Sequence, residues 1–89
     1  MIRDTITIIN KLGLHARASA KLNALAQQFE SRIEIERDGQ TADAKSIMSI
    51  MMLAASMGTE IILEVEGPDE EEAFCALCEL INNRFDEGE

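Results

Sequence analysis

Residues 32–43, RIEIERDGQTAD, predict a β-hairpin, and this hairpin sets the fold class. Two isoleucines, Ile33 and Ile35, alternate with glutamates, which is the pattern of a half-buried strand. The pair Asp38-Gly39 then supplies a two-residue turn of the kind that joins antiparallel strands. The middle of the chain is therefore expected to form two paired strands.

On the N-terminal side of the hairpin, we expect one strand and one helix. A run of β-branched residues predicts a strand over residues 5–9, with Ile6 and Ile8 on one face. The loop NKLGLH follows, and apolar residues at helical spacing predict a helix from Ala16 to about Phe29.

On the C-terminal side, the pattern is helix, strand, helix. Ser46 is expected to cap a helix that runs through IMSIMMLAAS and ends with Gly58 in the C′ position. Residues 60–66, EIILEVE, alternate as a strand does. The last helix is expected to begin after Asp69 as cap, with carboxylates in its first turn. Its buried stripe is expected to consist of Phe74, Leu77, Cys78, Ile81 and Phe85.

The predicted element order is therefore β-α-β-β-α-β-α. Four strands with helices on one face predict the α+β class, as an open-faced β-sandwich: a four-stranded antiparallel sheet covered on one face by three helices. At 89 residues, the chain is expected to be one domain, residues 1–89.

Composition excludes several classes of function. The net charge of −9 disfavours binding to nucleic acid, and three Phe without Tyr or Trp offer no platform for base stacking. No apolar run approaches the roughly 20 residues that span a membrane. The first residues, MIRDTITII, lack the features of a secretory signal, so a cytoplasmic protein is expected.

The cysteines Cys75 and Cys78 form a C-x-x-C motif, for which we favour a structural role. A zinc site needs about four ligands, and there is neither a second cysteine pair nor a nearby histidine. Reactive thiols lie at helix N-termini, whereas this pair lies inside a predicted helix after four acidic residues. We therefore expect small buried hydrophobic side chains, and no metal or cofactor.

The charges are distributed unevenly, and the only histidine lies in the cationic part. Residues 1–58 carry a net charge of +1, and residues 59–89 carry −10. No acidic residue occurs between Asp4 and Glu30, a segment that includes His15. This distribution suits the local binding of a small anion, although a chance distribution over a solvated surface would look the same.

His15 precedes the predicted first helix and would be its N-cap residue. The backbone N–H groups of Ala16, Arg17 and Ala18 would then point out of the helix end, which is a favourable site for phosphate. The Arg17 guanidinium can form paired hydrogen bonds with phosphoryl oxygens. A lone neutral imidazole suits direct attack on phosphorus, but a role as a simple cap remains open on these arguments.

Two motifs resemble one known family. GLHARASA resembles the active-site segment of HPr, the family of histidine-containing phosphocarriers of the bacterial phosphoenolpyruvate-dependent phosphotransferase system, and AKSIMSIMML resembles that family's second helix. The resemblance implies that His15 takes a phosphoryl group from enzyme I on Nδ1 and passes it to A domains of enzyme II. Such a protein is a covalent carrier rather than an enzyme, and a monomer is expected. Two departures are Ala18, where the family usually has proline, and Ser49, where it usually has glycine.

The second helix is expected to meet partners. It is apolar most of the way round, so we favour partner contact by Ile47, Met48 and Met51 over a purely buried role. Ser46 is expected to act first as a cap. In part of the HPr family, the matching serine is also phosphorylated by an HPr kinase/phosphorylase, and the resemblance implies such regulation here.

Two other functions stay open at this point. One is a regulatory phosphoprotein, including the nitrogen-related branch of the same system, without a direct role in sugar uptake. The other is a domain that binds a small anion reversibly at the helix end.

Overall fold

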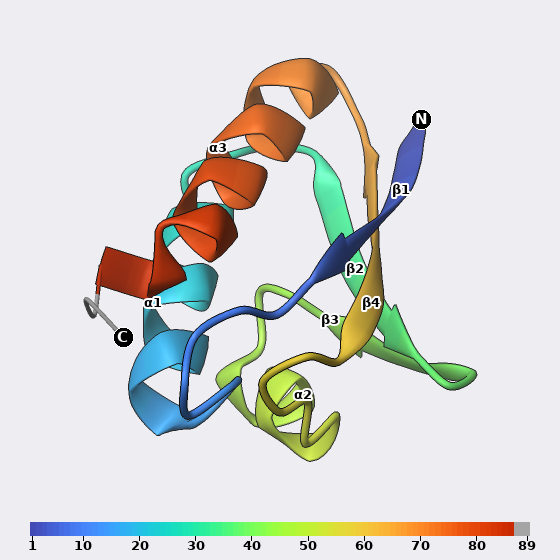
Figure 1. Ribbon diagram of the computed structural model, residues 1–89. Helices are drawn as coiled ribbons and strands as arrows, with labels where there is room; N and C mark the ends of the chain where they lie inside the picture. The colour runs from blue at the N-terminus through green and yellow to red at the C-terminus, as the bar shows by residue number, and fades with distance from the viewer. Residues whose placement is uncertain (87–89) are drawn as a thin grey trace.

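The structure is a computed structural model that describes residues 1–86. Its strands and helices follow the predicted order (Figure 1). The elements are β1 (Ile2–Thr7), α1 (Ala16–Ala26), β2 (Arg32–Arg37), β3 (Gln40–Asp43), α2 (Ile47–Met52), β4 (Glu60–Glu66), α3 (Glu70–Asn82) and a short turn η1 (Arg84–Asp86).

The four strands form one antiparallel sheet in the order β1-β4-β2-β3. The β2–β3 hairpin has the predicted turn, in which Arg37 pairs with Gln40 and both Asp38 and Gly39 have positive φ angles. Positive φ at both central residues is what a type I′ turn requires, so the Asp-Gly pair explains this hairpin locally.

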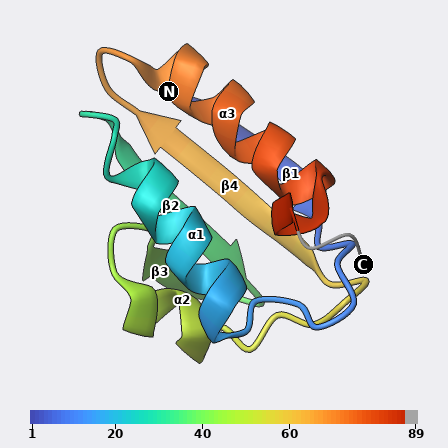
Figure 2. The same ribbon diagram turned by 90° about the vertical axis from the view of Figure 1, so that its left-hand side faces the viewer.

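The core lies between the sheet and the helices. Figure 2 shows α1 and α3 side by side across one face of the sheet, with α2 beside α1 near β3. The buried face of β4 alternates as predicted: Ile61, Leu63 and Val65 are at most 1% exposed. Opposite them, Leu22 of α1 and Leu77 of α3 are fully buried. The architecture is the predicted open-faced sandwich.

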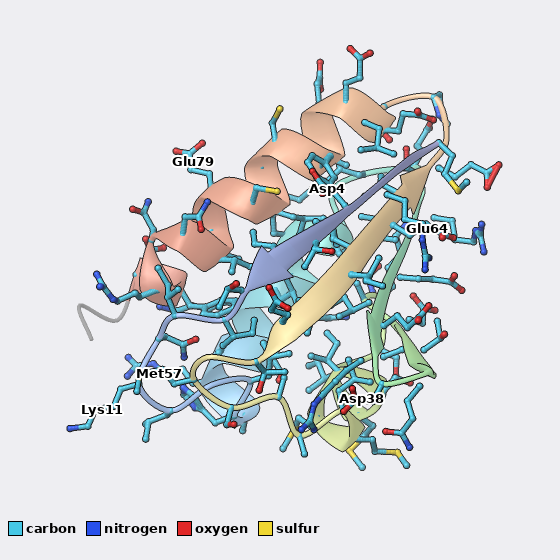
Figure 3. The ribbon with its side chains drawn as sticks, turned by 45° about the vertical axis from the view of Figure 1, so that its right-hand side comes forward. Asp4, Lys11, Asp38, Met57, Glu64 and Glu79 are labelled. Atoms are coloured by element: carbon cyan, nitrogen blue, oxygen red, sulfur yellow. The ribbon has the colours of Figure 1, made fainter. Side chains whose placement is uncertain are left out.

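The other face of the sheet is charged and open to solvent. There, Arg3 donates to Glu64 at 2.8 Å, and Arg32 donates to Glu66 at 2.9 Å. Figure 3 shows Glu64 on this side of β4. These exposed pairs contribute little stability individually, but opposite charges on neighbouring strands favour the observed register.

Three predicted boundaries differ from the structure. The first strand begins at Ile2 and ends at Thr7, before the buried Ile8, because the Ile8 N–H and C=O pair with Thr59 and Gly58 in the following loop. Helix α1 ends at Ala26 instead of near Phe29, because the N–H groups of residues 28 and 29 bond three residues back, which tightens the last turn.

The end of α2 was also predicted wrongly. Gly58 is not its C′ residue, because the helix stops at Met52, and Ala54 has a φ of 52° that is incompatible with a continuing helix. Gly58 instead lies in the loop before β4, where its N–H bonds to Ile8 at 2.7 Å.

Asp69 precedes α3 as expected, but its side chain makes no capping hydrogen bond to that helix. It accepts bonds from the N–H groups of Glu30 and Ser31 at 2.9 Å and from the Ser31 hydroxyl. These bonds, led by that of the Ser31 hydroxyl, hold the pKa of Asp69 below its ordinary value. Asp69 therefore joins the α1–β2 loop to the start of α3.

The stripe of α3 is only partly as predicted. Its fully buried residues are Ala73, Leu77 and Ile81, and Phe85 is buried in η1, beyond the helix. Phe74 and Cys78 are partly buried against the core.

The prediction that both cysteines are buried is wrong for Cys75, which is exposed. Two residues beyond Ala73, it lies on the side of the helix away from the core. Burial raises the pKa of the Cys78 thiol, and the proximity of Cys75 and Asp4 adds to the effect, so the reactive thiolate is disfavoured.

Candidate functional site

The start of α1 is organised around His15. This residue is the N-cap, with extended backbone angles (φ −79°, ψ −179°), and its carbonyl accepts the first helical bond from Ser19 at 2.8 Å. Its side chain makes no capping hydrogen bond and is half-buried. The first N–H groups of an α-helix have no partners within the helix, so those of Ala16, Arg17 and Ala18 point towards the space beside the imidazole.

The loop before His15 is fixed by its own residues. The Asn10 amide donates to the Gly13 carbonyl at 2.8 Å, and Gly13 adopts a left-handed φ of 67°. Leu14 is buried, and its carbonyl accepts a bond from the Ser19 hydroxyl at 3.2 Å. The backbone that leads into His15 is thus held from both sides.

A second loop, residues 53–59, lies against the first. The Leu14 N–H donates to the Ala55 carbonyl at 2.8 Å. A Cβ atom on Gly13 would lie 2.3 Å from the same carbonyl oxygen, so only glycine fits there. Figure 3 labels one residue of each loop, Lys11 and Met57.

The charge around this helix end is positive. No acidic residue lies in the first turn of α1, and Arg17 and Lys11 are exposed. Lys21, one turn after Arg17, is directed elsewhere, because its Nζ donates to the Phe85 carbonyl at 2.7 Å. Within residues 1–86, Arg17 and the positive end of the helix dipole are therefore the candidates for binding an anion at this end.

Ser46 caps α2 as predicted, with its hydroxyl accepting from the Ser49 N–H at 3.4 Å. Helix α1 fixes the chain just before it: Asn23 donates to the Ala44 carbonyl, and Gln27 donates to the Lys45 carbonyl. The structure does not place Ser46 in the α1 helix end with His15; it begins a separate helix packed against α1.

The residues predicted to meet partners are exposed. Within α2, only Ile50 is buried, since it is the residue that faces the core. The exposed residues form a surface that we call the methionine patch: Ile47 (39% exposed), Met48 (70%), Met51 (38%) and Met52 (76%). Sequence reasoning omitted Met52, together with the exposed Leu12 and Met57 of the two loops near His15. The all-round apolar pattern could have indicated Met52.

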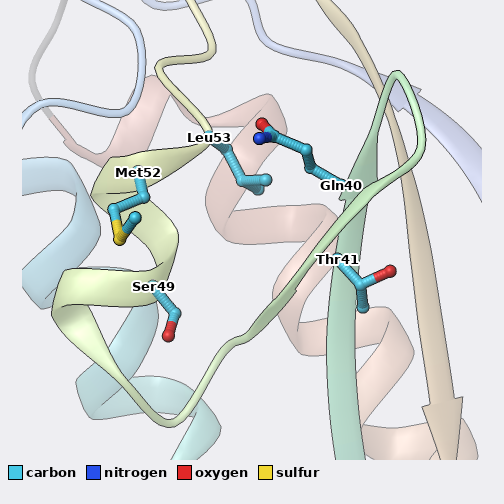
Figure 4. Close-up of a pocket in the computed structure, with 5 residues that line it drawn as sticks. All are labelled: Gln40, Thr41, Ser49, Met52 and Leu53. Carbon is cyan, nitrogen blue, oxygen red and sulfur yellow. The ribbon is translucent and has the colours of Figure 1, made fainter.

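A pocket lies between α2 and β3, next to the methionine patch. Figure 4 shows its lining, made of Gln40, Thr41, Ser49, Met52 and Leu53. Its lining includes neither His15 nor Arg17.

Residues 1–86 offer neither a metal-binding cluster nor a membrane-spanning helix. No group of three or more His, Cys, Asp or Glu side chains is arranged as a metal site. None of the helices in this part of the chain is long and apolar enough to cross a membrane.

The arrangement suits transfer of an anionic group. It combines one imidazole at a helix N-terminus, one exposed guanidinium two residues later and an apolar surface on the neighbouring helix. Phosphoryl transfer depends mainly on positioning and on stabilisation of negative charge, and these groups supply both.

Comparison with known proteins gives consistent matches. Residues 2–83 match the family model described as "PTS HPr component phosphorylation site". The phosphocarrier protein HPr of Cupriavidus necator is 63% identical over 87 residues, which cover 98% of this chain and 97% of that protein.

Two solved structures from Thermoanaerobacter tengcongensis are also similar, each 48% identical. A crystal structure of HPr has a TM-score of 0.94 and covers 98% of both chains. A crystal structure of an HPr dimer has a TM-score of 0.77 and covers 96% of this chain and 98% of that one.

Proposed function

The chain belongs to the HPr family of phosphocarrier proteins of the phosphotransferase system, and we propose that His15 is the residue that carries the phosphoryl group. In this proposal, His15 accepts the group from phospho-enzyme I and passes it to A domains of enzyme II. The observation that carries it is the position of His15 as N-cap of an 11-residue helix whose first turn has no acidic residue.

The proposed step is a substitution at phosphorus. A lone pair of the neutral imidazole forms the new N–P bond, while the bond from phosphorus to the donor breaks and its electron pair stays with the donor. The second ring nitrogen keeps or releases its proton to solvent. The same exchange in the opposite sense delivers the group to the next acceptor, so the protein is regenerated and acts as a carrier.

Arg17 and the helix end stabilise the charge that the group brings. The backbone N–H groups of Ala16, Arg17 and Ala18 and the positive end of the helix dipole favour a bound anion. Arg17 adds a planar fork that matches two phosphoryl oxygens. Ala18, in place of the usual proline, provides one N–H more at this end.

The test is labelling with phosphoenolpyruvate and enzyme I, followed by intact-mass measurement. We expect the wild-type protein to gain one phosphoryl group that is labile in acid and stable in base. The His15→Ala variant should gain none, while its circular dichroism spectrum stays that of the folded protein. A folded His15→Ala protein that is still labelled would refute the proposal.

The methionine patch is proposed as the docking surface for enzyme I and the enzyme II A domains. Exposed apolar side chains, including flexible methionines, suit contact with several different partners. Met48→Asp should weaken binding to enzyme I at least tenfold, because a charge in the middle of an apolar contact loses its hydration. Met48→Leu is the matched control and should bind nearly as the wild type. Equal binding by Met48→Asp in NMR titrations would place the interface elsewhere.

Ser46 is proposed as a second, regulatory phosphorylation site for an HPr kinase/phosphorylase. A phosphate on a cap residue is compatible with the helix that follows it, and it would add about two negative charges beside the methionine patch. A purely regulatory phosphoprotein remains the alternative function. We propose that the working unit is a monomer, and the dimer among the similar structures makes sedimentation the direct check.

A further inference from the structure

Arg37, at the end of β2, reaches the far end of α2. Its Nη1 donates to the carbonyl of Leu53 at 2.7 Å and to that of Ala54 at 3.2 Å. The side chain is 31% exposed, so it is partly shielded from solvent. A cation is favourable at a helix C-terminus, where the last carbonyls have no partners within the helix.

The two carbonyls belong to an unusual turn. Ala54 is a non-glycine residue with a φ of 52°, a left-handed conformation that costs roughly 1–2 kcal/mol for such a residue. The Ala54 N–H bonds to Met51 at 3.1 Å, which ends the helix. The bonds from Arg37 therefore lie at the residues where the chain turns away from α2.

The next residue along the chain supports the loop of His15. The Ala55 carbonyl accepts the Leu14 N–H, and the same oxygen lies against Gly13. Leu14 is the residue directly before His15. Arg37 binds the carbonyls of Leu53 and Ala54, and Ala55 is the next residue of the chain. The hydrogen bond between Ala55 and Leu14 then connects this turn to the backbone that enters His15.

We infer that Arg37 is a positioning residue for His15: by fixing the Leu53–Ala54 turn, it holds the Ala55 carbonyl where the Leu14 N–H needs it. In this inference, the action of Arg37 passes through the backbone of residues 53–55, whose first two carbonyls it binds. The part of this inference that concerns transfer rests on the proposed role of His15.

Arg32 provides a matched control on the same strand. It is also an arginine of β2, but it bonds to Glu66 on the open face of the sheet and to no residue of the two loops. The variants to compare are Arg37→Met, Arg37→Lys and Arg32→Met. Methionine keeps much of the length of the side chain without its donors, and lysine retains a charged donor.

The first readout is hydrogen exchange of the Leu14 amide, measured by NMR. We expect Arg37→Met to speed this exchange about tenfold, the effect of losing hydrogen bonds to a charged group. Arg37→Lys should recover much of the protection, and Arg32→Met should change it less than twofold. Unchanged exchange in folded Arg37→Met, or equal changes in Arg32→Met and Arg37→Met, would overturn the inference. If Arg37→Met does not fold, Arg37→Gln, which is shorter and uncharged, replaces it in the same comparison.

The second readout is phosphorylation of His15 by phosphoramidate, a small donor that needs no docking surface. The imidazole displaces ammonia from phosphorus, so the rate reports on the site and not on a partner. We expect a several-fold lower rate for Arg37→Met, with that of Arg32→Met unchanged. If Arg37→Met shows faster exchange of the Leu14 amide but an unchanged rate of His15 phosphorylation, the positioning role is overturned. A wild-type protein that takes no phosphate on His15 would refute the proposed function itself, whatever the exchange shows.

Discussion

The first turns of α1 and α3 use the same element in opposite ways. Both helices begin with a residue whose side chain makes no capping bond, His15 in one case and Asp69 in the other. Helix α3 has three glutamates in its first turn, so its own carboxylates meet the positive end of the dipole. Helix α1 has no acidic residue in its first turn. The two helix ends thus differ in charge, and in the proposed function only the end of α1 meets an anionic group from outside.

The most direct way to break this contrast is to give α1 the charge of α3. Ala16→Glu places a carboxylate in an exposed position of the first turn. The new carboxylate would repel each negative charge of an incoming phosphoryl group by about 1–3 kcal/mol at a separation of roughly 6 Å. We therefore expect acceptance of phosphate from phospho-enzyme I to slow about tenfold or more. Folding stability should rise slightly, by about 0.3–1 kcal/mol, through the helix dipole.

Ala16→Gln is the control for this variant, because it has the same size and no charge. Stopped-flow transfer rates and thermal unfolding of both variants separate the two effects. Equal transfer rates for Ala16→Glu and Ala16→Gln would show that the helix end does not bind the phosphoryl group.

The opposite change tests the closed end of α3. Asp69→Asn should lower the melting temperature, because Asn cannot accept all three bonds from Glu30 and Ser31. Since the folded-state pKa of Asp69 is lowered, its stabilisation is complete above the unfolded-state pKa of about 3.9 and is lost as pH falls through the folded value. Phosphoryl transfer should not change.

Melting temperatures measured from neutral pH down to about pH 2 provide the check for Asp69. Glu71→Gln is the control, because Glu71 is an exposed carboxylate of the same turn. A Glu71→Gln variant that loses as much acid-dependent stability as Asp69→Asn would contradict the special role of Asp69.

Variants of Ser46 are expected to have the smallest effects on stability and transfer. They extend the comparison to a third helix end, that of α2. Ser46→Ala should cost about 1 kcal/mol through loss of the cap. Ser46→Asp should fold as stably as the wild type, and it should slow transfer from enzyme I less than Ala16→Glu does, because its charge begins a different helix. Urea unfolding and the same transfer assay measure both quantities. A normal transfer rate for Ser46→Asp would leave Ser46 only its capping role.

Local signals in the sequence predicted most of the fold. The Asp38-Gly39 turn, the alternation of Glu60–Glu66 and the start of α1 at His15 depend on neighbouring residues, and all three are confirmed. Sequence reasoning failed where a distant residue decides. Helix α2 ends at Met52, earlier than predicted, and Arg37 of the β2–β3 hairpin binds the turn that follows. The residues around Ala54 carry no local signal for this end.

The candidate site was predicted in the same uneven way. The placement of His15 and Ser46 as cap residues follows from local sequence and is confirmed. The support of Leu14 by Ala55 joins residues 41 positions apart, so composition and periodicity could not reveal it. Asp69 was expected to cap its own helix, yet its carboxylate accepts a hydrogen bond from Ser31, 38 residues earlier in the chain. This contact depends on how the loops before β2 and before α3 pack together.

The strand order also has a consequence for how the chain is made in the cell. Strand β1 pairs with β4, and Ile2 lies opposite Val65, so the first strand has its partner only after most of the chain has been synthesised. The loop that enters His15 likewise needs Ala55. A nascent chain emerging from the ribosome therefore exposes its histidine before the residues that complete the site have been synthesised.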